Sequence, residues 1–165
     1  MSDSAPLPAP LPVRMVLDDL AGTATQQLIA RHLNAMRDTC AIDSVHALDL
    51  EALRHPAITV WSAWRGDQIA GVGALKMLDS RRGELKSMRV DDRHLGTGVG
   101  RAILRHIMTE AALRGVESLW LETGVEPHFL PAHRLYASEG FIECEPFADY
   151  RPDPLSMFMT RTLAP

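Results

Sequence analysis

A short run of glycines constrains this chain more than any other feature of its sequence. Gly96, Gly98 and Gly100 alternate in a segment that follows an extended stretch and leads directly into an amphipathic helix. Glycines at alternate positions remove the Cβ atoms from one side of a turn, so a ligand can approach the bare backbone. The first amides of a helix have no intrahelical acceptor, and the positive end of the helix dipole favours an anion there. The run therefore predicts a site for a phosphate or pyrophosphate group, most naturally that of a cofactor.

The residues around the glycines exclude some of the known phosphate-binding motifs. No Gly-Lys-Ser/Thr ending follows the run, so it is not a Walker A loop. Its spacing also differs from the Gly-x-Gly-x-x-Gly of dinucleotide-binding folds, although Glu117 and Glu122 lie near the distance at which such folds place an acidic residue. A strand-to-helix turn that binds no ligand is the alternative at this point.

Length and composition indicate one ordinary globular domain. The chain has 165 residues, of which 46% are hydrophobic and 23% charged, as in many soluble proteins. A net charge of −4 argues against a nucleic-acid partner. The absence of an apolar stretch near the ~20 residues of a membrane span argues against a membrane protein. Cys40 and Cys144 are too few and too far apart for a disulfide framework or a zinc site, and the histidines show no metalloprotease spacing, so we expect no metal.

The N-terminal segment differs from the rest of the chain. Residues 1–12 include four prolines at alternate positions, and we expect them to form a flexible tail ahead of a single domain of residues 13–165. They lack the basic start and the apolar run of a signal peptide. The sequence therefore predicts a cytoplasmic protein.

Hydrophobic periodicity predicts a mixed α/β fold. Apolar residues recur every four positions from Val99 to Ala111, which predicts a helix that packs on a sheet and stops at Gly115. The turn residues 65–67 between two apolar runs predict a hairpin. The expected strands are 13–17, 57–64, 68–78, 83–90, 118–122, 141–144 and 155–160, and the other expected helices are 23–37, 46–54 and 131–139.

Two segments resemble the GNAT (Gcn5-related) superfamily of acyl-CoA N-acyltransferases. Residues 90–100, Val-Asp-Asp-Arg-His-Leu-Gly-Thr-Gly-Val-Gly, match its Arg/Gln-x-x-Gly-x-Gly/Ala signature. Residues 132–141, Ala-His-Arg-Leu-Tyr-Ala-Ser-Glu-Gly-Phe, are similar to its Ala-x-x-Leu-Tyr-x-x-x-Gly-Phe segment. The resemblance extends over residues 13–163 and implies a single-domain GNAT fold, with a mixed, mostly antiparallel central sheet flanked by helices.

Four further segments, residues 44–49, 84–89, 121–124 and 144–150, resemble a narrower group of bacterial acetyltransferases. Some members of that group carry the label indole-acetic-acid acetyltransferase, although the indole ring nitrogen is a poor nucleophile. One departure is visible. Phe129 stands seven residues before the tyrosine of the second segment, where many relatives have an asparagine that contacts the cofactor.

The resemblance implies a site for acetyl-CoA along the glycine run. The backbone amides of residues 95–101 are expected to hold the pyrophosphate, with two arginines available for charge-assisted contacts or, alternatively, simply solvated. Backbone groups of the strand ending at residue 90 would pair with the pantetheine arm. The predicted cofactor-binding residues are Met88, Val90, Arg93, Leu95, Gly96, Thr97, Gly98, Val99, Gly100 and Arg101.

Acetyl transfer to an amine needs an acid for the departing thiolate and a base for the amine. Tyr136 is the predicted acid, because a phenol with a pKa of about 10 can protonate a thiolate; a packed core tyrosine is the alternative. Glu84 is the predicted base, at a position matching a catalytic glutamate of some relatives, and a salt bridge with Lys86 is the alternative. Strand alternation would place Glu84, Lys86, Met88 and Val90 on one face.

His46 is a third candidate residue. A neutral imidazole titrates in a useful range and could act as a base or as a ligand for the substrate. Its place at the expected start of a helix also fits a capping or packing role.

The leading prediction is an enzyme that transfers an acetyl group from acetyl-CoA to a primary amine of a small molecule, by direct attack in a ternary complex. Neither cysteine has an obvious activating base beside it, which argues against a covalent acyl-enzyme. The alternatives are a non-catalytic acyl-CoA-binding module and an acyltransferase acting on a protein amino group. A homodimer is a possible assembly, because dimers are common among similar proteins.

Overall fold

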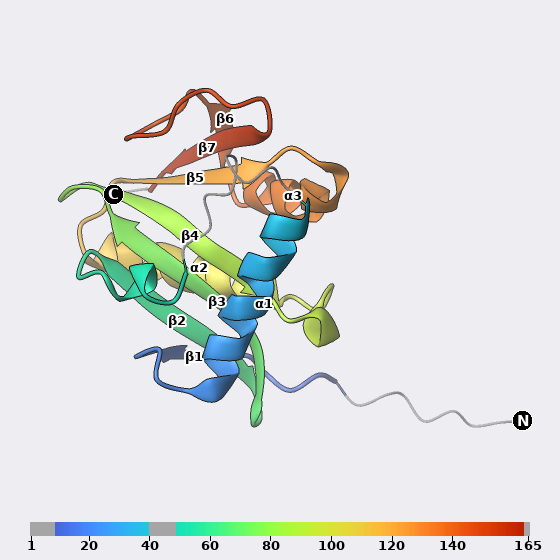
Figure 1. The fold of residues 1–165 in the computed structure, drawn as a ribbon. Coiled ribbons are helices and arrows are strands. Elements are labelled where there is room, and N and C mark those ends of the chain that lie inside the picture. Colours follow the sequence, from blue (N-terminus) through green and yellow to red (C-terminus); the bar gives the residue numbers. More distant parts are fainter. Residues whose placement is uncertain (1–8, 40–48, 164–165) are drawn as a thin grey trace, which may run out of the picture.

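The computed structural model describes residues 9–39 and 49–163 (Figure 1). The predicted tail of residues 1–12 therefore lies mostly outside the described residues. In the described chain, seven strands form one sheet in the order β1-β2-β3-β4-β5-β7-β6. Neighbouring strands are antiparallel except for β4 and β5, which are parallel. The strands are β1 (Arg14–Leu17), β2 (Ile58–Arg65), β3 (Gln68–Met77), β4 (Arg82–Val90), β5 (Ser118–Gly124), β6 (Ile142–Cys144) and β7 (Ser156–Thr162).

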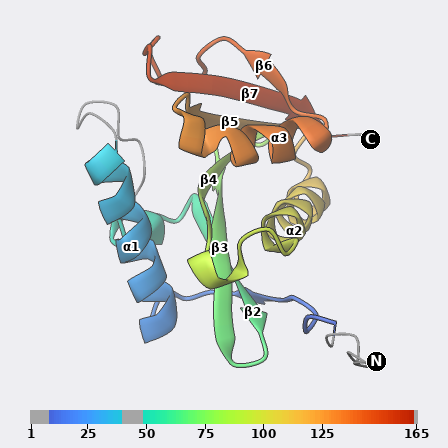
Figure 2. The same ribbon diagram turned by 90° about the vertical axis from the view of Figure 1, so that its right-hand side faces the viewer.

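Helices cover both faces of this sheet, as Figure 2 shows. Helix α1 (Thr23–Thr39) lies on one face, α2 (Val99–Leu113) lies on the other, and α3 (Leu130–Ser138) lies beside β5. Among the described residues, the single-turn 3-10 helices are η2 (Ala52–Arg54), η3 (Asp92–His94) and η4 (Pro127–Phe129). The mixed, mostly antiparallel sheet flanked by helices is the predicted fold class, which is thereby confirmed. No helix in the described ranges is both long and apolar enough to cross a membrane.

The apolar stripe of α2 belongs to the larger of two buried clusters in the described part of the chain. Val99, Ile103, Ile107 and Ala111 are all buried, as the four-residue spacing predicted. The helix sits close to β3, because a Cβ added at Gly73 would lie 2.6 Å from Cγ2 of Ile103. A second cluster joins α1 to the opposite face of β2 and β3. The sheet is therefore buried on both sides, which explains the nearly continuous apolar run in β3.

One predicted helix is different in the structure. Of the helix expected over residues 46–54, the described part from residue 49 onward contains only the 3-10 turn η2. Residues 46–48 lie outside the described residues. The turn ends at His55, just before Pro56, where the backbone becomes extended (φ −58°, ψ 138°), as expected of a residue that precedes proline.

Strand β4 carries a β-bulge near its middle. Ser87 and Met88 together face a single residue of β3, Gly73, so the register shifts at this point. Ser87 has a φ of +55°, in the left-handed region that side chains rarely adopt. A bulge inserts one extra residue and bends its strand, and bulges often lie next to active sites.

The bulge corrects one expectation about this strand. Alternation predicted that Glu84, Lys86, Met88 and Val90 share one face, and this is wrong for the last two. Met88 lies on the α2 side, because a Cβ at Gly73 would be 2.9 Å from its sulfur, and Val90 packs in the same cluster. Glu84 and Lys86 lie on the opposite face. The extra residue reverses the alternation halfway along the strand.

Strands β4 and β5 pair only over their first residues. Residues 82–84 of β4 pair with 118–120 of β5. Beyond this point the two strands diverge toward α3 (Figure 1), while β5 stays paired with β7 along its whole length. The divergence leaves a gap between the two strands. Beyond residue 84, the backbone edge of β4 that faces this gap has no hydrogen-bonded partner strand within residues 9–39 and 49–163. This gap holds the candidate site.

Candidate active site

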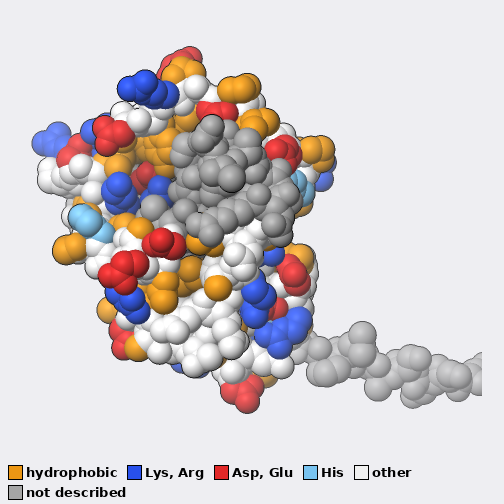
Figure 3. Space-filling model, in the orientation of Figure 1, with side chains coloured by type: hydrophobic (Ala, Val, Ile, Leu, Met, Phe, Trp, Pro, Cys, Tyr) orange, Lys and Arg blue, Asp and Glu red, His pale blue; other side chains and the backbone are white. Residues whose placement is uncertain are grey.

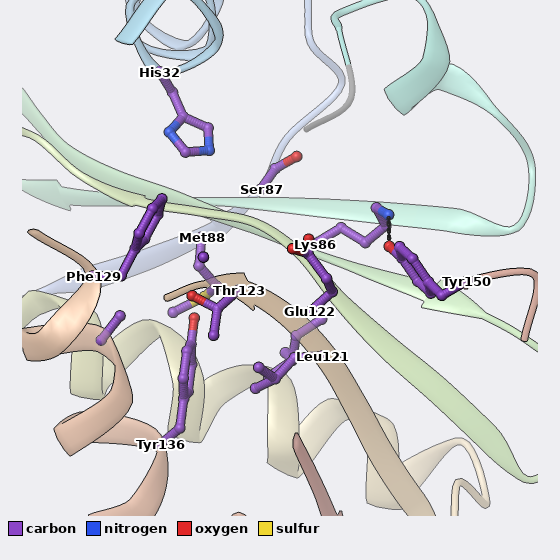
Figure 4. Close-up of a pocket in the computed structure, with 13 residues that line it drawn as sticks. His32, Lys86, Ser87, Met88, Leu121, Glu122, Thr123, Phe129, Tyr136 and Tyr150 are labelled. Atoms are coloured by element: carbon purple, nitrogen blue, oxygen red, sulfur yellow. Dashed lines mark hydrogen bonds between the residues drawn. The ribbon is translucent and has the colours of Figure 1, made fainter. Parts of the chain in front are cut away.

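A cleft of about 110 Å³ lies between the diverging parts of β4 and β5. We call it the central cleft (Figure 4). Its walls come from β4, the end of β5, one face of α3, one side chain of α1 and the loop that follows β6. The lining residues are His32, Leu85, Lys86, Ser87, Met88, Leu121, Glu122, Thr123, Gly124, Phe129, Ala132, Tyr136 and Tyr150.

Tyr136, the predicted acid, points from α3 into the central cleft toward Thr123 (Figure 4). Its ring is buried and packs against Phe141, with 5.9 Å between ring centroids. Burial, and then the charge of Glu122, raises the pKa of the phenol to about 12. Its hydroxyl has no hydrogen-bond partner within the described chain. The phenol therefore stays protonated at neutral pH and can donate a proton or a hydrogen bond into the cleft.

Glu84, the predicted base, lies in a buried polar cluster with Lys86 and Tyr150. Its side chain is 2% exposed, and its Oε2 is 3.3 Å from Nζ of Lys86. The Tyr150 hydroxyl lies 3.1 Å from the same oxygen and 2.9 Å from Nζ of Lys86. Burial, and then the charges of Glu84 and Glu122, raises the pKa of the Tyr150 phenol. The alternative expected for Glu84, a salt bridge with Lys86, is therefore present.

The polar cluster separates the central cleft from a second hollow of about 400 Å³, which we call the outer cavity. Lys86 and Tyr150 line both spaces, whereas Glu84 lines the outer cavity alone. The residues of the outer cavity are Lys76, Leu78, Glu84, Lys86, Ala148, Asp149, Tyr150, Arg151, Pro152 and Asp153. Sequence reasoning did not single out Tyr150 as a site residue, although it ends the segment 144–150 that resembles bacterial acetyltransferases.

His32 and Ser87 bring two further polar atoms to the central cleft, and sequence reasoning missed both. Within the described chain, Nδ1 of His32 and Oγ of Ser87 are buried and have no hydrogen-bond partner. Burial, and then the charge of Arg89, lowers the pKa of His32 to about 4. The imidazole is therefore neutral at physiological pH. Ser87 sits in the bulge, which no sequence pattern indicated.

The glycine loop forms an open anion site at the start of α2. Gly96 and Gly98 have φ values of +70° and +88°, which favour glycine, and a Cβ at either would meet nothing within 4 Å. The first helical hydrogen bond runs from the amide of Ala102 to Gly98, 3.0 Å. The three preceding amides, of residues 99–101, have no acceptor among the residues described, and the helix has no side-chain cap. Such a row of free amides suits a phosphate oxygen.

The two predicted arginines already have partners. Arg93 pairs with Asp91, with Nε 3.0 Å from the carboxylate, and its side chain is 60% exposed. Arg101 is hydrogen-bonded to Glu139 at the end of α3 and so joins α2 to α3. Both side chains reach solvent beside the loop. Their contact with a phosphate stays a prediction.

A third arginine, Arg65 at the end of β2, is hydrogen-bonded to the glycine loop. Arg65 donates to Oγ1 of Thr97 at 2.6 Å and to its carbonyl at 2.8 Å. Thr97 in turn donates to the carbonyl of His94. These bonds hold the loop from outside and add positive charge next to the free amides. The other loop residue in the predicted set, Leu95, is 61% exposed.

Three other expectations concern this region. Phe129 covers Gly124 at the end of β5, since a Cβ at Gly124 would be 2.2 Å from its ring, and it lines the central cleft. His46 lies outside the described residues. No group of three or more His, Cys, Asp or Glu in the described ranges is arranged to hold a metal ion.

On the face shown in Figure 3, acidic and basic side chains are interspersed rather than gathered by sign.

Comparison with known proteins identifies the family. Residues 24–141 match the model of the acetyltransferase (GNAT) family. The uncharacterized N-acetyltransferase YsnE of Bacillus subtilis is 54% identical over 147 residues, which cover 89% of this chain and 97% of YsnE. The chain belongs to the GNAT acetyltransferase family. The uncharacterized N-acetyltransferase YedL of Escherichia coli, 50% identical over 88% of this chain and 92% of YedL, agrees with this GNAT assignment. So does the IAA acetyltransferase of Azospirillum brasilense, 38% identical over 85% of this chain and 91% of that protein.

Solved structures show the same fold. A Klebsiella pneumoniae protein assigned as an acyl-CoA N-acyltransferase superposes with a TM-score of 0.75 at 26% identity, covering 92% of this chain and 98% of the other. A GNAT acetyltransferase of Elizabethkingia anophelis with acetyl-CoA bound superposes with a TM-score of 0.68 at 18% identity, covering 92% and 98%. The resemblance first seen in the glycine run and the Leu-Tyr segment is thus confirmed. This GNAT protein is an acetyl-CoA-dependent N-acetyltransferase.

Proposed function

We propose that this GNAT protein transfers the acetyl group of acetyl-CoA to a primary amine of a small molecule, by direct attack within a ternary complex. The observation that carries the proposal is the order of three features along the chain from β4 to α2. The cleft into which Tyr136 points lies beside the edge of β4 that is not paired with β5, β4 ends at Val90, and the free amides of residues 99–101 follow at the start of α2. A thioester, an extended arm and a pyrophosphate group can occupy these three parts in that order.

The backbone of β4 supports the middle of this arrangement. Beyond residue 84 its edge is not paired with β5. An unpaired strand edge presents amide and carbonyl groups to any extended partner. In our proposal these groups bind the amides of the pantetheine arm, while Met88 lines the cleft and Val90 packs against the core. The residues 93–101 then hold the phosphates, as expected from the sequence.

Two observations support a ternary complex. The central cleft and the outer cavity meet at Lys86 and Tyr150, so donor and acceptor can enter from two sides at the same time. Cys144, the free cysteine in the described ranges, is not part of the cleft wall. Burial, and then the charges of two neighbouring glutamates, raises the pKa of its thiol. A thiol of this kind is a poor candidate for a covalent acyl carrier.

Tyr136 and Glu84 have complementary roles in the proposed reaction. The thioester supplies the activated acetyl group when acetyl-CoA is bound. Tyr136 donates its proton to the departing sulfur, and its raised pKa keeps the phenol protonated at neutral pH until the C–S bond breaks. Glu84 receives the proton lost by the amine. A small-molecule acceptor is consistent with the name of the Azospirillum relative, and the acceptor itself is to be found by assay.

The proposal is tested with a panel of acceptors. Purified protein is incubated with acetyl-CoA and each of 2-phenylethylamine, tyramine, spermidine, lysine, kanamycin and a lysine-containing peptide, and thiol release and acetylated product are measured together. We expect a product from a small amine, with one thiol released per acetyl group transferred. Acetyl-CoA binding without any acetylated amine would instead favour the non-catalytic module, and transfer to the peptide alone would favour a protein acetyltransferase.

A further inference from the structure

We propose that the Tyr150 hydroxyl carries the proton of the attacking amine from the central cleft to the carboxylate of Glu84, with Lys86 holding that hydroxyl in place. The inference rests on the proposed function, because it assigns a proton path to that acetyl transfer. It makes Tyr150 a catalytic residue, which neither the sequence motifs nor the family match indicated.

The arrangement of the two hollows requires such a connection. Glu84 is 2% exposed and lines the outer cavity, but it is not part of the wall of the central cleft, where Tyr136 points. Tyr150 lines both spaces, and its hydroxyl lies 3.1 Å from Oε2 of Glu84. An amine that attacks a thioester in the cleft therefore meets the Tyr150 hydroxyl before it can reach the carboxylate.

The donors in the cluster set the direction of the hydrogen bonds. The ammonium of Lys86 can only donate, so its 2.9 Å contact uses the phenolic oxygen of Tyr150 as acceptor. The hydroxyl proton of Tyr150 is then directed to Glu84. A hydroxyl oxygen can accept two hydrogen bonds, so the N–H of a bound amine can donate to it alongside Lys86.

The ring of Tyr150 is held firmly enough to keep this geometry. Its centroid is 5.1 Å from that of Phe147 and 5.4 Å from that of Phe158. Both phenylalanines are buried. The loop after β6 is thus anchored in an aromatic cluster, which restrains the position of the Tyr150 hydroxyl.

The proton transfers balance as follows. The amine nitrogen attacks the thioester carbonyl carbon, forming the C–N bond and leaving the nitrogen positively charged. Its proton passes to the oxygen of Tyr150 while the hydroxyl proton of Tyr150 passes to Glu84. The C–S bond then breaks, and the sulfur takes a proton from Tyr136. Tyr136 regains a proton from solvent, and Glu84 releases one to solvent through the outer cavity, so amine and acetyl-CoA give amide and free CoA.

The charges around the cluster favour relay over ionisation of the phenol. Burial, Glu84 and Glu122 raise the pKa of Tyr150, so it exchanges one proton for another and does not become a phenolate. The other titratable and charged groups that line the two spaces are Lys76 on β3, Lys86 on β4, His32 on α1, Tyr136 on α3, and Asp149, Arg151 and Asp153 on the loop.

The test compares Tyr150→Phe, Glu84→Gln and the double variant, using the amine of the acceptor panel that wild type acetylates with the highest kcat/KM. We expect each single variant to lower kcat at pH 7 at least tenfold, because general acid–base catalysis typically contributes about 10²–10⁴-fold. The double variant should be no slower than the slower single variant, because both changes break one path. The loss should shrink at high pH, where hydroxide can take the proton directly from the charged nitrogen that forms on attack.

Two controls separate a proton path from a structural role. Acetyl-CoA affinity by calorimetry and the urea unfolding midpoint show whether each variant is folded and binds the donor. Phe158→Leu disturbs the same aromatic cluster but keeps the hydroxyl, so it should lower stability without moving the pH profile of kcat. A Tyr150→Phe enzyme with wild-type kcat and pH profile, or losses that multiply in the double variant, would overturn the relay. Absence of wild-type turnover with every amine would overturn the proposed function itself, and the relay with it.

Discussion

Replacement of His32 by glutamine should change how the stability of this protein depends on pH. In the folded protein, burial and the nearby Arg89 lower the pKa of His32 from 6.5 to about 4. His32 therefore becomes protonated near pH 6.5 in the unfolded chain but only near pH 4 in the folded protein. The free energy of unfolding consequently decreases as the pH falls from 6.5 to 4. One pKa unit corresponds to about 1.4 kcal/mol. Wild type should thus lose about 2 kcal/mol by pH 5 and about 3 kcal/mol in total through this residue.

The assay is urea unfolding of wild type and His32→Gln at half-unit steps from pH 7.5 to 4.5. Glutamine keeps a hydrogen-bonding side chain but does not titrate, so the difference between the two free energies of unfolding isolates His32. His128→Gln, at an exposed histidine, controls for the substitution itself. We expect the advantage of wild type over His32→Gln to shrink steadily below pH 6.5. A constant difference across the whole range would show that His32 is not a buried neutral imidazole and would remove it from the cleft wall as described.

Two further predictions concern the acid and the packing of the sheet. Tyr136→Phe should lower kcat at least tenfold while leaving acetyl-CoA affinity nearly unchanged, measured by thiol release and calorimetry; full turnover at every pH would refute Tyr136 as the acid. Gly73→Ala should reduce the free energy of unfolding by about 1–3 kcal/mol, because its Cβ would lie 2.6 Å from Ile103 and 2.9 Å from the Met88 sulfur. Urea unfolding measures this, and unchanged stability would contradict the close approach of α2 to β3.

Much of the fold follows from local sequence patterns. The stripe from Val99 to Ala111, the hairpin around Gly66 and the alternating glycines each depend on neighbours in the chain, and the structure has all three where they were expected. Two parts of the candidate site could also be located from the sequence. The glycine loop and Tyr136 lie in segments whose spacing resembles the family, and the structure gives the loop free amides at the start of α2 and places Tyr136 in the wall of the central cleft. Their roles stay predictions.

The parts that could not be predicted depend on contacts between distant segments. The bulge at Ser87 arises where β4 pairs with β3, and the sequence of β4 alone gives an unbroken alternation. Tyr150 meets Glu84 across 66 positions of the chain, and His32 reaches the cleft from α1, far from β4 and β5 in the sequence. Burial decides the protonation of both side chains, and burial is a property of the assembled fold.

The central claim is that acetyl-CoA is held by the glycine loop and the cleft between β4 and β5. Calorimetric titration of wild type and Gly98→Trp with acetyl-CoA tests it most directly. Gly115→Trp is the matched control, because Gly115 also has a positive φ, +81°, and open surroundings, but lies beyond the opposite end of α2. We predict micromolar binding by wild type and Gly115→Trp, and at least tenfold weaker binding, about 1.4 kcal/mol, by Gly98→Trp. Equal affinity in all three folded proteins, or no binding by wild type, would contradict the account.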